Sequence, residues 1–248
     1  MRGFPPLSWP LLALVLAGGS IALWPAASAP AAGPSSAVSL DDLHGSAKLD
    51  ALVERVVERQ RGLRSLRADF VQVKTSDMLL DAVRSTGEFF YSAPDSVRWD
   101  YAQPDPMVVL FNDDFVTTYH PTGKRAERVK VSSRDRRFVQ ALAGTLPLDD
   151  LMVYFSLTMS DAGAPRPYTF DLVPTAATLK KKLDSLHIEI DRALLLPVVV
   201  EFREADGDFT RYEFRQLQID PEFDPDRFKL EFGDGVLVET IDASNGLS

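Results

Sequence analysis

The chain has 248 residues, of which 45% are hydrophobic, 36 are Asp or Glu, 27 are Lys or Arg and none is cysteine. This length allows one large or two small domains, and the apolar content suffices for a core. The net charge of -9 argues against a general nucleic-acid binder, because binding phosphates requires a surplus of Lys and Arg. The lack of cysteine excludes disulfides, thiolate nucleophiles and cysteine-zinc sites.

Residues 1–31 are predicted to be an export signal and leader rather than part of the fold. Arg2 is the only charge before Asp41, and a short apolar run at Leu11–Leu16 precedes small-residue cleavage sites at Ala27–Ala31. This order is typical of a cleaved secretory signal. The alternative, an uncleaved membrane anchor, is disfavoured because two prolines close the apolar run early. We therefore expect an exported protein of the bacterial periplasm.

The first part of the mature chain reads as one helix followed by strands. Between Leu43 and Leu66, apolar residues recur at spacings of three and four, which predicts an amphipathic helix with Ser46 as its N-cap. The period then changes to two, and this alternation predicts strands at 68–75, 83–91, 97–101, 107–111 and 115–120. Short strands separated by turns indicate an antiparallel meander.

The second part begins differently. The pattern from Ser133 to Met159 predicts one or two short amphipathic helices. Alternation then returns, and we predict strands around 168–172, 186–191, 198–202, 212–214 and 228–232. The fold class is thus expected to be α+β, with a single domain at 32–242 and a tail at 243–248. A large curved antiparallel sheet would form an unclosed β-barrel capped by a helical lid.

One face of the predicted sheet is rich in large apolar side chains. Periodicity alone does not distinguish a filled core from a hollow that encloses an apolar ligand, so both interpretations stay open at this point. The residues expected to face inward are Phe89, Tyr91, Val97, Trp99, Tyr101, Ile188, Ile190, Val198, Val200, Phe202, Tyr212 and Phe214.

Residues that suggest catalysis are sparse. His44, His120 and His187 lie far apart without a metal-binding spacing, and no G-x-S-x-G motif is present. The paired aspartates fall at predicted turns or helix starts, where carboxylates cap backbone N–H groups. We therefore expect no enzyme activity, no metal and no cofactor. A hydrolase that uses an unrecognised pair of carboxylates stays open as an alternative.

Several short motifs stand in an order that is typical of one known family. They are Leu66–Gln72, Gly87–Phe89, Pro94, Val97–Tyr101, Gln103–Asp105, Phe170–Pro174 and Asp224–Phe228. Together with the order of elements, they resemble the periplasmic outer-membrane lipoprotein carriers (the LolA family) over nearly the whole mature chain. The resemblance implies an unclosed antiparallel barrel with a helical lid over an apolar cavity, and it thereby favours the hollow over the filled core.

The resemblance also implies a function. Such a carrier takes lipidated proteins from an inner-membrane transporter, shields their acyl chains in the periplasm and passes them to an outer-membrane receptor. We expect a monomer, and a periplasmic lipid- or lipoprotein-sensing regulatory module on the same fold is the alternative. The residues expected in the lid and the wall beside it are Val53, Val56, Val57, Leu63, Phe138, Leu142, Leu151, Met152 and Phe155.

Two positions depart from the family pattern. In the family, a basic residue before the proline that corresponds to Pro94 holds the lid closed, whereas this chain has Ala93. The aromatic residue that is usual at position 97 is replaced by Val97. Arg98 and Arg84 are the nearest possible substitutes for the latch, but alternation predicts that both point outward. The resemblance therefore predicts the family's fold with a lid that is held differently.

Overall fold

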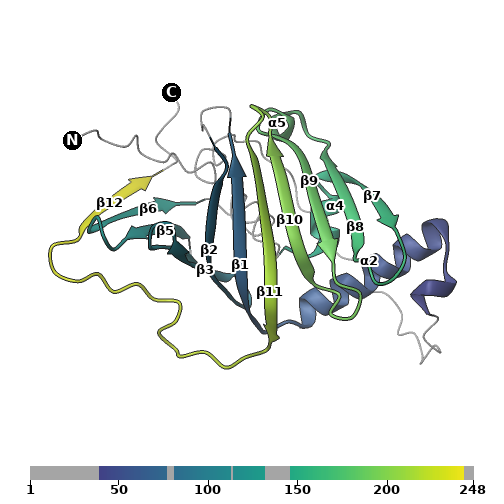
Figure 1. The fold of residues 1–248 in the computed structure, drawn as a ribbon, viewed down its shortest axis with the longest axis horizontal. Coiled ribbons are helices and arrows are strands. Elements are labelled where there is room, and N and C mark those ends of the chain that lie inside the picture. The colour runs from purple at the N-terminus through teal and green to yellow at the C-terminus, as the bar shows by residue number, and fades with distance from the viewer. Residues whose placement is uncertain (1–38, 77–80, 113, 132–145, 243–248) are drawn as a thin grey trace, which may run out of the picture.

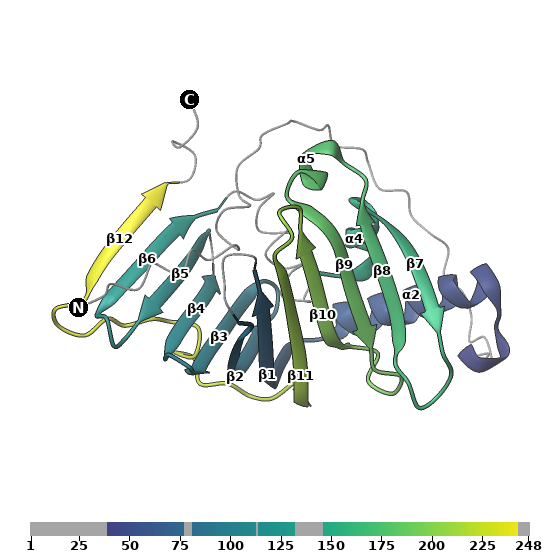
Figure 2. The same cartoon turned by 45° about the horizontal axis from the view of Figure 1, so that its top comes forward.

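The computed structural model describes residues 39–76, 81–112, 114–131 and 146–242. Within them, a 12-stranded sheet has the order β12-β6-β5-β4-β3-β2-β1-β11-β10-β9-β8-β7. Figures 1 and 2 show a strongly curved sheet whose two edge strands, β12 and β7, lie far apart. The predicted α+β class with a large unclosed sheet is confirmed.

Pairing between strands is antiparallel except for β12 and β6, which are parallel. The strands are β1 Ser65–Thr75, β2 Val83–Ser92, β3 Ser96–Gln103, β4 Met107–Asn112, β5 Phe115–His120, β6 Arg125–Lys130, β7 Phe155–Asp161, β8 Tyr168–Pro174, β9 Leu183–Ile190, β10 Pro197–Glu204, β11 Phe209–Ile219 and β12 Leu237–Asp242. The helical elements are η1 Leu40–Asp42, α2 Gly45–Gly62, α4 Leu148–Met152 and α5 Ala177–Lys180. None of the helices in the described ranges is long and apolar enough to cross a membrane.

Three sequence predictions about elements are wrong. α2 begins after His44, and Ser46 lies inside the helix rather than at its N-cap. Phe155 starts β7 instead of belonging to a helix, because apolar residues alternate with serine and threonine over Phe155–Asp161. The predicted strand at 228–232 is a loop, and β12 forms the edge of the sheet instead.

The helix α2 covers the inner face of one half of the sheet. Its buried residues Leu52 and Val56 belong to the main core cluster together with the inward side chains of β7 to β10. Figure 2 shows α2 crossing this part of the sheet. At one end of α2, Lys48 Nζ lies 2.6 Å from Asp161 Oδ2 of β7, and near the other end Arg59 Nε donates to the carbonyl of Leu194 at 3.2 Å.

The outer face of the other half is covered by residues 221–236, which we call the strap. Figure 1 shows the strap running from the end of β11 to the far edge, where β12 begins. Arg98 Nη1 donates to the carbonyl of Arg227 at 2.8 Å, and Asn112 Nδ2 donates to the carbonyl of Phe228 at 3.0 Å. The segment that contains Phe228 and Phe232 therefore lies across the sheet and does not extend it as a strand.

Aromatic rings complete the contact between strap and sheet. The centroid of Phe223 lies 5.7 Å from that of Phe90 on β2, and the centroid of Phe232 lies 5.3 Å from that of Tyr119 on β5. The guanidinium of Arg227 stacks over the Phe90 ring at 4.6 Å. Phe90 is only 2% exposed, so the strap removes a large apolar side chain of the outer face from water.

Candidate functional site

The strand register brings the predicted inward residues onto one face. Residues directly opposite each other in antiparallel strands point to the same side of the sheet. Tyr91 pairs with Val97, and Phe89 pairs with Trp99. On the other half of the sheet, Ile188 pairs with Val200, which in turn pairs with Tyr212.

Burial agrees with this placement. The predicted inward residues that are buried are Phe89, Tyr91, Val97, Trp99, Tyr101, Ile188, Ile190, Val200, Phe202, Tyr212 and Phe214. Val198 differs from them and is half-buried, because the register of β10 against β9 shifts between Pro197 and Val199.

Aromatic rings form the centre of the inner face. The Phe70 centroid lies 4.9 Å from that of Trp99 and 4.8 Å from that of Tyr101, both edge-on. Trp99 also lies 4.8 Å from Tyr212 and 5.7 Å from Phe214. These separations are those of favourable aromatic pairs. The cluster joins β1, β3 and β11, so it links the two halves of the sheet.

Phe70 is the residue of this cluster that the sequence analysis did not select. It lies opposite Gly87, and a Cβ added there would come within 2.8 Å of the Phe70 ring and would overlap the carbonyl oxygen of Asp100. Glycine at this position therefore leaves room for the Phe70 ring and for the backbone of Asp100. An aromatic residue opposite a glycine in a strand was the available signal.

Two tyrosine hydroxyls lie among these rings. Gln72 Nε2 donates to the Tyr212 hydroxyl at 2.7 Å, and the hydroxyls of Tyr101 and Tyr212 are 3.4 Å apart. Burial raises the pKa of Tyr212 to about 12 and the pKa of Tyr101 well above its usual value. Both hydroxyls are therefore neutral at physiological pH, and the aromatic part of the inner face carries no charge.

The predicted lid and wall residues fall into three groups. Those that are buried or half-buried in the covering layer are Val53, Val56, Val57, Leu63 and Leu151. Phe155 is buried but belongs to the sheet, and Met152 is 43% exposed at the end of α4, so neither side chain belongs to a covering helix face. Phe138 and Leu142 lie outside the described residues.

The helices α2 and α4, which we call the helical cover, are connected to each other by polar contacts. The side-chain oxygen of Gln60 accepts from the backbone N–H of Leu148 at 2.9 Å, and Arg61 Nη2 lies 2.6 Å from Asp149 Oδ2. Arg98 points outward as predicted and is engaged by the strap. In the part of the chain that the structure describes, the contacts of Gln60 and Arg61 are thus the polar connection between the two covering helices.

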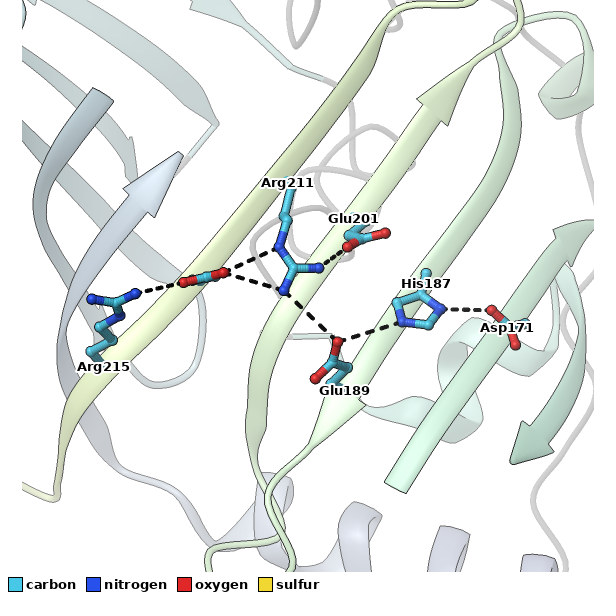
Figure 3. A network of polar contacts seen from close by, with 7 residues as sticks. Asp171, His187, Glu189, Glu201, Arg211 and Arg215 are labelled. Atoms are coloured by element: carbon cyan, nitrogen blue, oxygen red, sulfur yellow. Dashed lines mark hydrogen bonds and ion pairs between the residues drawn. The ribbon is translucent and has the colours of Figure 1, made fainter. Parts of the chain in front are cut away.

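The outer face of β8 to β11 is lined by charged residues. Figure 3 shows Arg211 among three glutamates; its Nη2 lies 3.3 Å from Glu213 and 3.9 Å from Glu189. The predicted outward position of His187 is confirmed, and its Nδ1 lies 2.7 Å from Asp171 Oδ1. Opposite charges on neighbouring strands stabilise the sheet modestly.

Within the described residues, no group of three or more His, Asp or Glu is placed to hold a metal ion.

Known proteins resemble this chain in sequence and in fold. The family model described as outer membrane lipoprotein carrier protein LolA matches residues 61–231. An outer-membrane lipoprotein carrier protein of Alkalilimnicola ehrlichii is 29% identical over 183 residues, which cover 73% of this chain and 79% of that protein. Another, from Methylococcus capsulatus, is 26% identical over 181 residues, which cover 71% of this chain and 81% of that protein.

Among solved structures, an uncharacterized conserved protein from Thermus thermophilus superposes with a TM-score of 0.50 at 8% sequence identity. The match covers 76% of this chain and 98% of that one. At this identity the likeness concerns the fold alone. The match to the family model runs from the end of α2 to residue 231 within the strap, and thus includes the strands β1 to β11 that form the inner face. The chain belongs to the family of outer membrane lipoprotein carrier proteins, LolA.

Proposed function

We propose that this protein is a periplasmic carrier that shields the acyl chains of lipoproteins between the sheet and its helical cover, and moves them from the inner to the outer membrane. The observation that carries the proposal is the continuous apolar inner face, which runs from β3 to β8 and is covered by α2 in one half of the sheet. Family membership supports the same reading. No catalytic step is part of the proposal.

The energetics of such a carrier require a balance. Burying one methylene is worth about 0.8 kcal/mol, so a long acyl chain gains on the order of 12 kcal/mol before any costs. A carrier that bound with all of this energy would release its cargo too slowly. Here Leu52 and Val56 of α2 already contact the inner face, and a lipid must displace part of that contact. The displaced contacts offset much of the gain and allow release.

The proposal extends to the ends of the chain and to the partners. Residues 1–31 would direct export and be removed, residues 32–242 would form the carrier domain, and residues 243–248 would be a tail. A monomer would accept lipidated proteins from an inner-membrane lipoprotein-releasing transporter and deliver them to an outer-membrane lipoprotein receptor. Neither nucleic acid nor a cofactor has a role in this scheme.

The first test measures binding to the inner face with an environment-sensitive hydrophobic dye that lipopeptide displaces. Val200→Glu places a charge at a position that is 0% exposed and is expected to abolish dye binding. Val173→Glu makes the same change at a position that is 50% exposed and should leave binding intact. Because Val200→Glu can also impair folding, Val53→Glu on α2, where the side chain is half-buried, provides a second variant. Unchanged dye binding in folded Val200→Glu and Val53→Glu proteins would refute the proposed site.

The second test measures transport. The purified protein is added to inner-membrane vesicles that contain a lipoprotein, and soluble lipoprotein–carrier complex is then offered to outer-membrane vesicles. Release followed by delivery supports the carrier. Binding of lipopeptide without release would instead identify a sensing module on the same fold.

A further inference from the structure

One end of the inner face is polar rather than apolar. Along β1 the inward side chains change from Phe70 to Gln72 and then Lys74. Lys74 lies opposite Thr210 of β11, which in turn lies opposite Phe202 of β10. The ends of β1 and β10 and the start of β11 therefore form a polar corner that continues the aromatic surface.

Glu204, the last residue of β10, belongs to this corner. It lies opposite Leu183, whose side chain is 1% exposed, and it follows Val200 and Phe202 on the same face of the strand. Glu204 itself is only 8% exposed, and its Oε1 is buried without a hydrogen-bond partner in the described part of the chain. A carboxyl group in this position is unusual, because a buried polar group without a partner destabilises the protein.

Thr210 shows the same feature on the neighbouring strand. It is 1% exposed, and its Oγ1 also has no partner among the described residues. Lys74 is the cation that acts on the Glu204 carboxyl, but it makes no hydrogen bond to Oε1 in the described structure, and its Nζ lies 3.5 Å from Asp208 Oδ2. Two buried oxygens of adjacent strands thus face the same corner with hydrogen-bonding capacity unused.

The charges around the corner favour one kind of ligand. Asp206 and Asp208 of the β10–β11 turn lie close enough to Glu204 to raise its pKa, and Lys74 lowers it. With burial as the largest contribution, the pKa of Glu204 rises to about 7, so the carboxyl is partly ionised at neutral pH. A buried carboxyl that has two aspartates and one lysine around it favours a hydrogen-bond donor or a cation over a phosphate or a free carboxylate.

We propose that Glu204 and Thr210 bind the nitrogen group at the root of the acyl chains of a lipidated peptide, while the chains themselves lie along the aromatic surface beside the corner. This inference rests on the proposed carrier function. The nitrogen can be an amide N–H of an N-acylated terminus or the ammonium of a free terminus, and Glu204 accepts its hydrogen. The Thr210 hydroxyl donates to a neighbouring carbonyl oxygen. The corner thereby sets the direction in which the lipidated end enters.

The test compares three probes by calorimetry or dye displacement on the mature full-length protein. They are a dipalmitoyl lipopeptide with a free amine, its N-palmitoylated counterpart, and palmitate, which has no N–H group. Glu204→Leu removes the acceptor and keeps an apolar side chain of similar length, so the fold should tolerate it. Thr210→Val removes only the hydroxyl. Glu222→Leu, at an exposed position in the strap, is the matched control.

We expect Glu204→Leu to lower the ratio of lipopeptide affinity to palmitate affinity about tenfold, and Thr210→Val to lower it about threefold. A loss confined to the free-amine peptide identifies the ammonium as the ligand, and a loss for both peptides identifies the N–H group common to them. An unchanged ratio in both variants overturns this inference while the carrier function stands. If the wild-type protein binds none of the three probes, the carrier function itself is wrong.

Discussion

The two halves of the sheet protect their apolar faces in different ways. In the half from β7 to β11, the outer face carries the charged network of Figure 3 and stays open, while α2 covers the inner face. In the half from β2 to β5, the outer face also carries large apolar side chains, with Phe90 and Leu110 each 2% exposed, and the strap covers it. In the half from β7 to β11, α2 can therefore move away from the inner face without any change at the outer face, which is charged and already open to solvent.

The attachments of the two covers differ as well. The strap is held by hydrogen bonds from Arg98 and Asn112 to its backbone carbonyls and by edge-on contacts between aromatic rings. The polar contacts of α2 include Lys48 near one end and Arg59, Gln60 and Arg61 near the other. We therefore expect the strap to act as a fixed part of the scaffold and α2 to be the layer that yields to cargo.

The largest expected effect concerns the aromatic cluster that joins the halves. Phe70→Ala removes a ring that contacts Trp99 and Tyr101 on one side and Tyr212 on the other. The resulting cavity should lower the free energy of unfolding by about 3–5 kcal/mol, measured by urea denaturation. Val173→Ala, at an exposed position of β8, should change it by less than about 0.5 kcal/mol. A small effect of Phe70→Ala would show that the two halves are not coupled through this cluster.

A smaller effect is expected where the strap meets the sheet. Phe90→Ala removes the ring between Phe223 and Arg227 and should destabilise the protein by about 2–3 kcal/mol. Limited proteolysis should then cut within the strap, residues 221–236, faster than in the wild-type protein. Dye binding at the inner face should persist, because Phe90 lies on the other face of the sheet. If a folded Phe90→Ala protein lost dye binding, the strap and the inner face would not be independent of each other, which would contradict this interpretation.

Much of this fold could be predicted from alternation because most strands have one buried and one solvated face. Two strands were less visible. β6 has buried residues only at Ala126 and Val129 among charged neighbours, and the apolar residues of β12, such as Leu237, are exposed. The strap could not be placed, although the continuous apolar runs at Phe89–Tyr91 and Val108–Phe111 do indicate strands that are covered on both faces.

The inner face could be predicted in outline but not in its details. The half-buried state of Val198 depends on a register shift between β10 and β9, and alternation within one strand does not reveal such a shift. The polar corner was within reach, because the period that places Val200 and Phe202 inward also places Glu204 inward. The sequence does not reveal that the Glu204 carboxyl oxygen has no hydrogen-bond partner among the described residues, because that depends on contacts between distant segments.

The smallest expected effect tests the attachment of α2 to the edge of the sheet. Burial opposes the charged form of Asp161, but hydrogen bonds from Lys48, Gly163 N–H and Arg192 outweigh it and lower the pKa from 3.8 to about 2. Since the folded pKa lies below the unfolded one, the stabilisation is present above pH 4 and is lost as the pH falls towards 2. Asp161→Asn keeps an acceptor for Gly163 N–H but removes the charge, so it should cost about 1–2 kcal/mol at pH 6.

In urea denaturation at pH 6, 4 and 2.5, the difference between the wild-type protein and Asp161→Asn should shrink steadily as the pH falls. Asp184→Asn, at an exposed position of β9, should show no such trend. If the contact of Lys48 with Asp161 holds down one end of the cover, Asp161→Asn should also bind hydrophobic dye more tightly at pH 6, because less α2 contact has to be displaced. Weaker binding would mean that α2 forms part of the fixed scaffold like the strap, and that cargo enters at another position along the inner face.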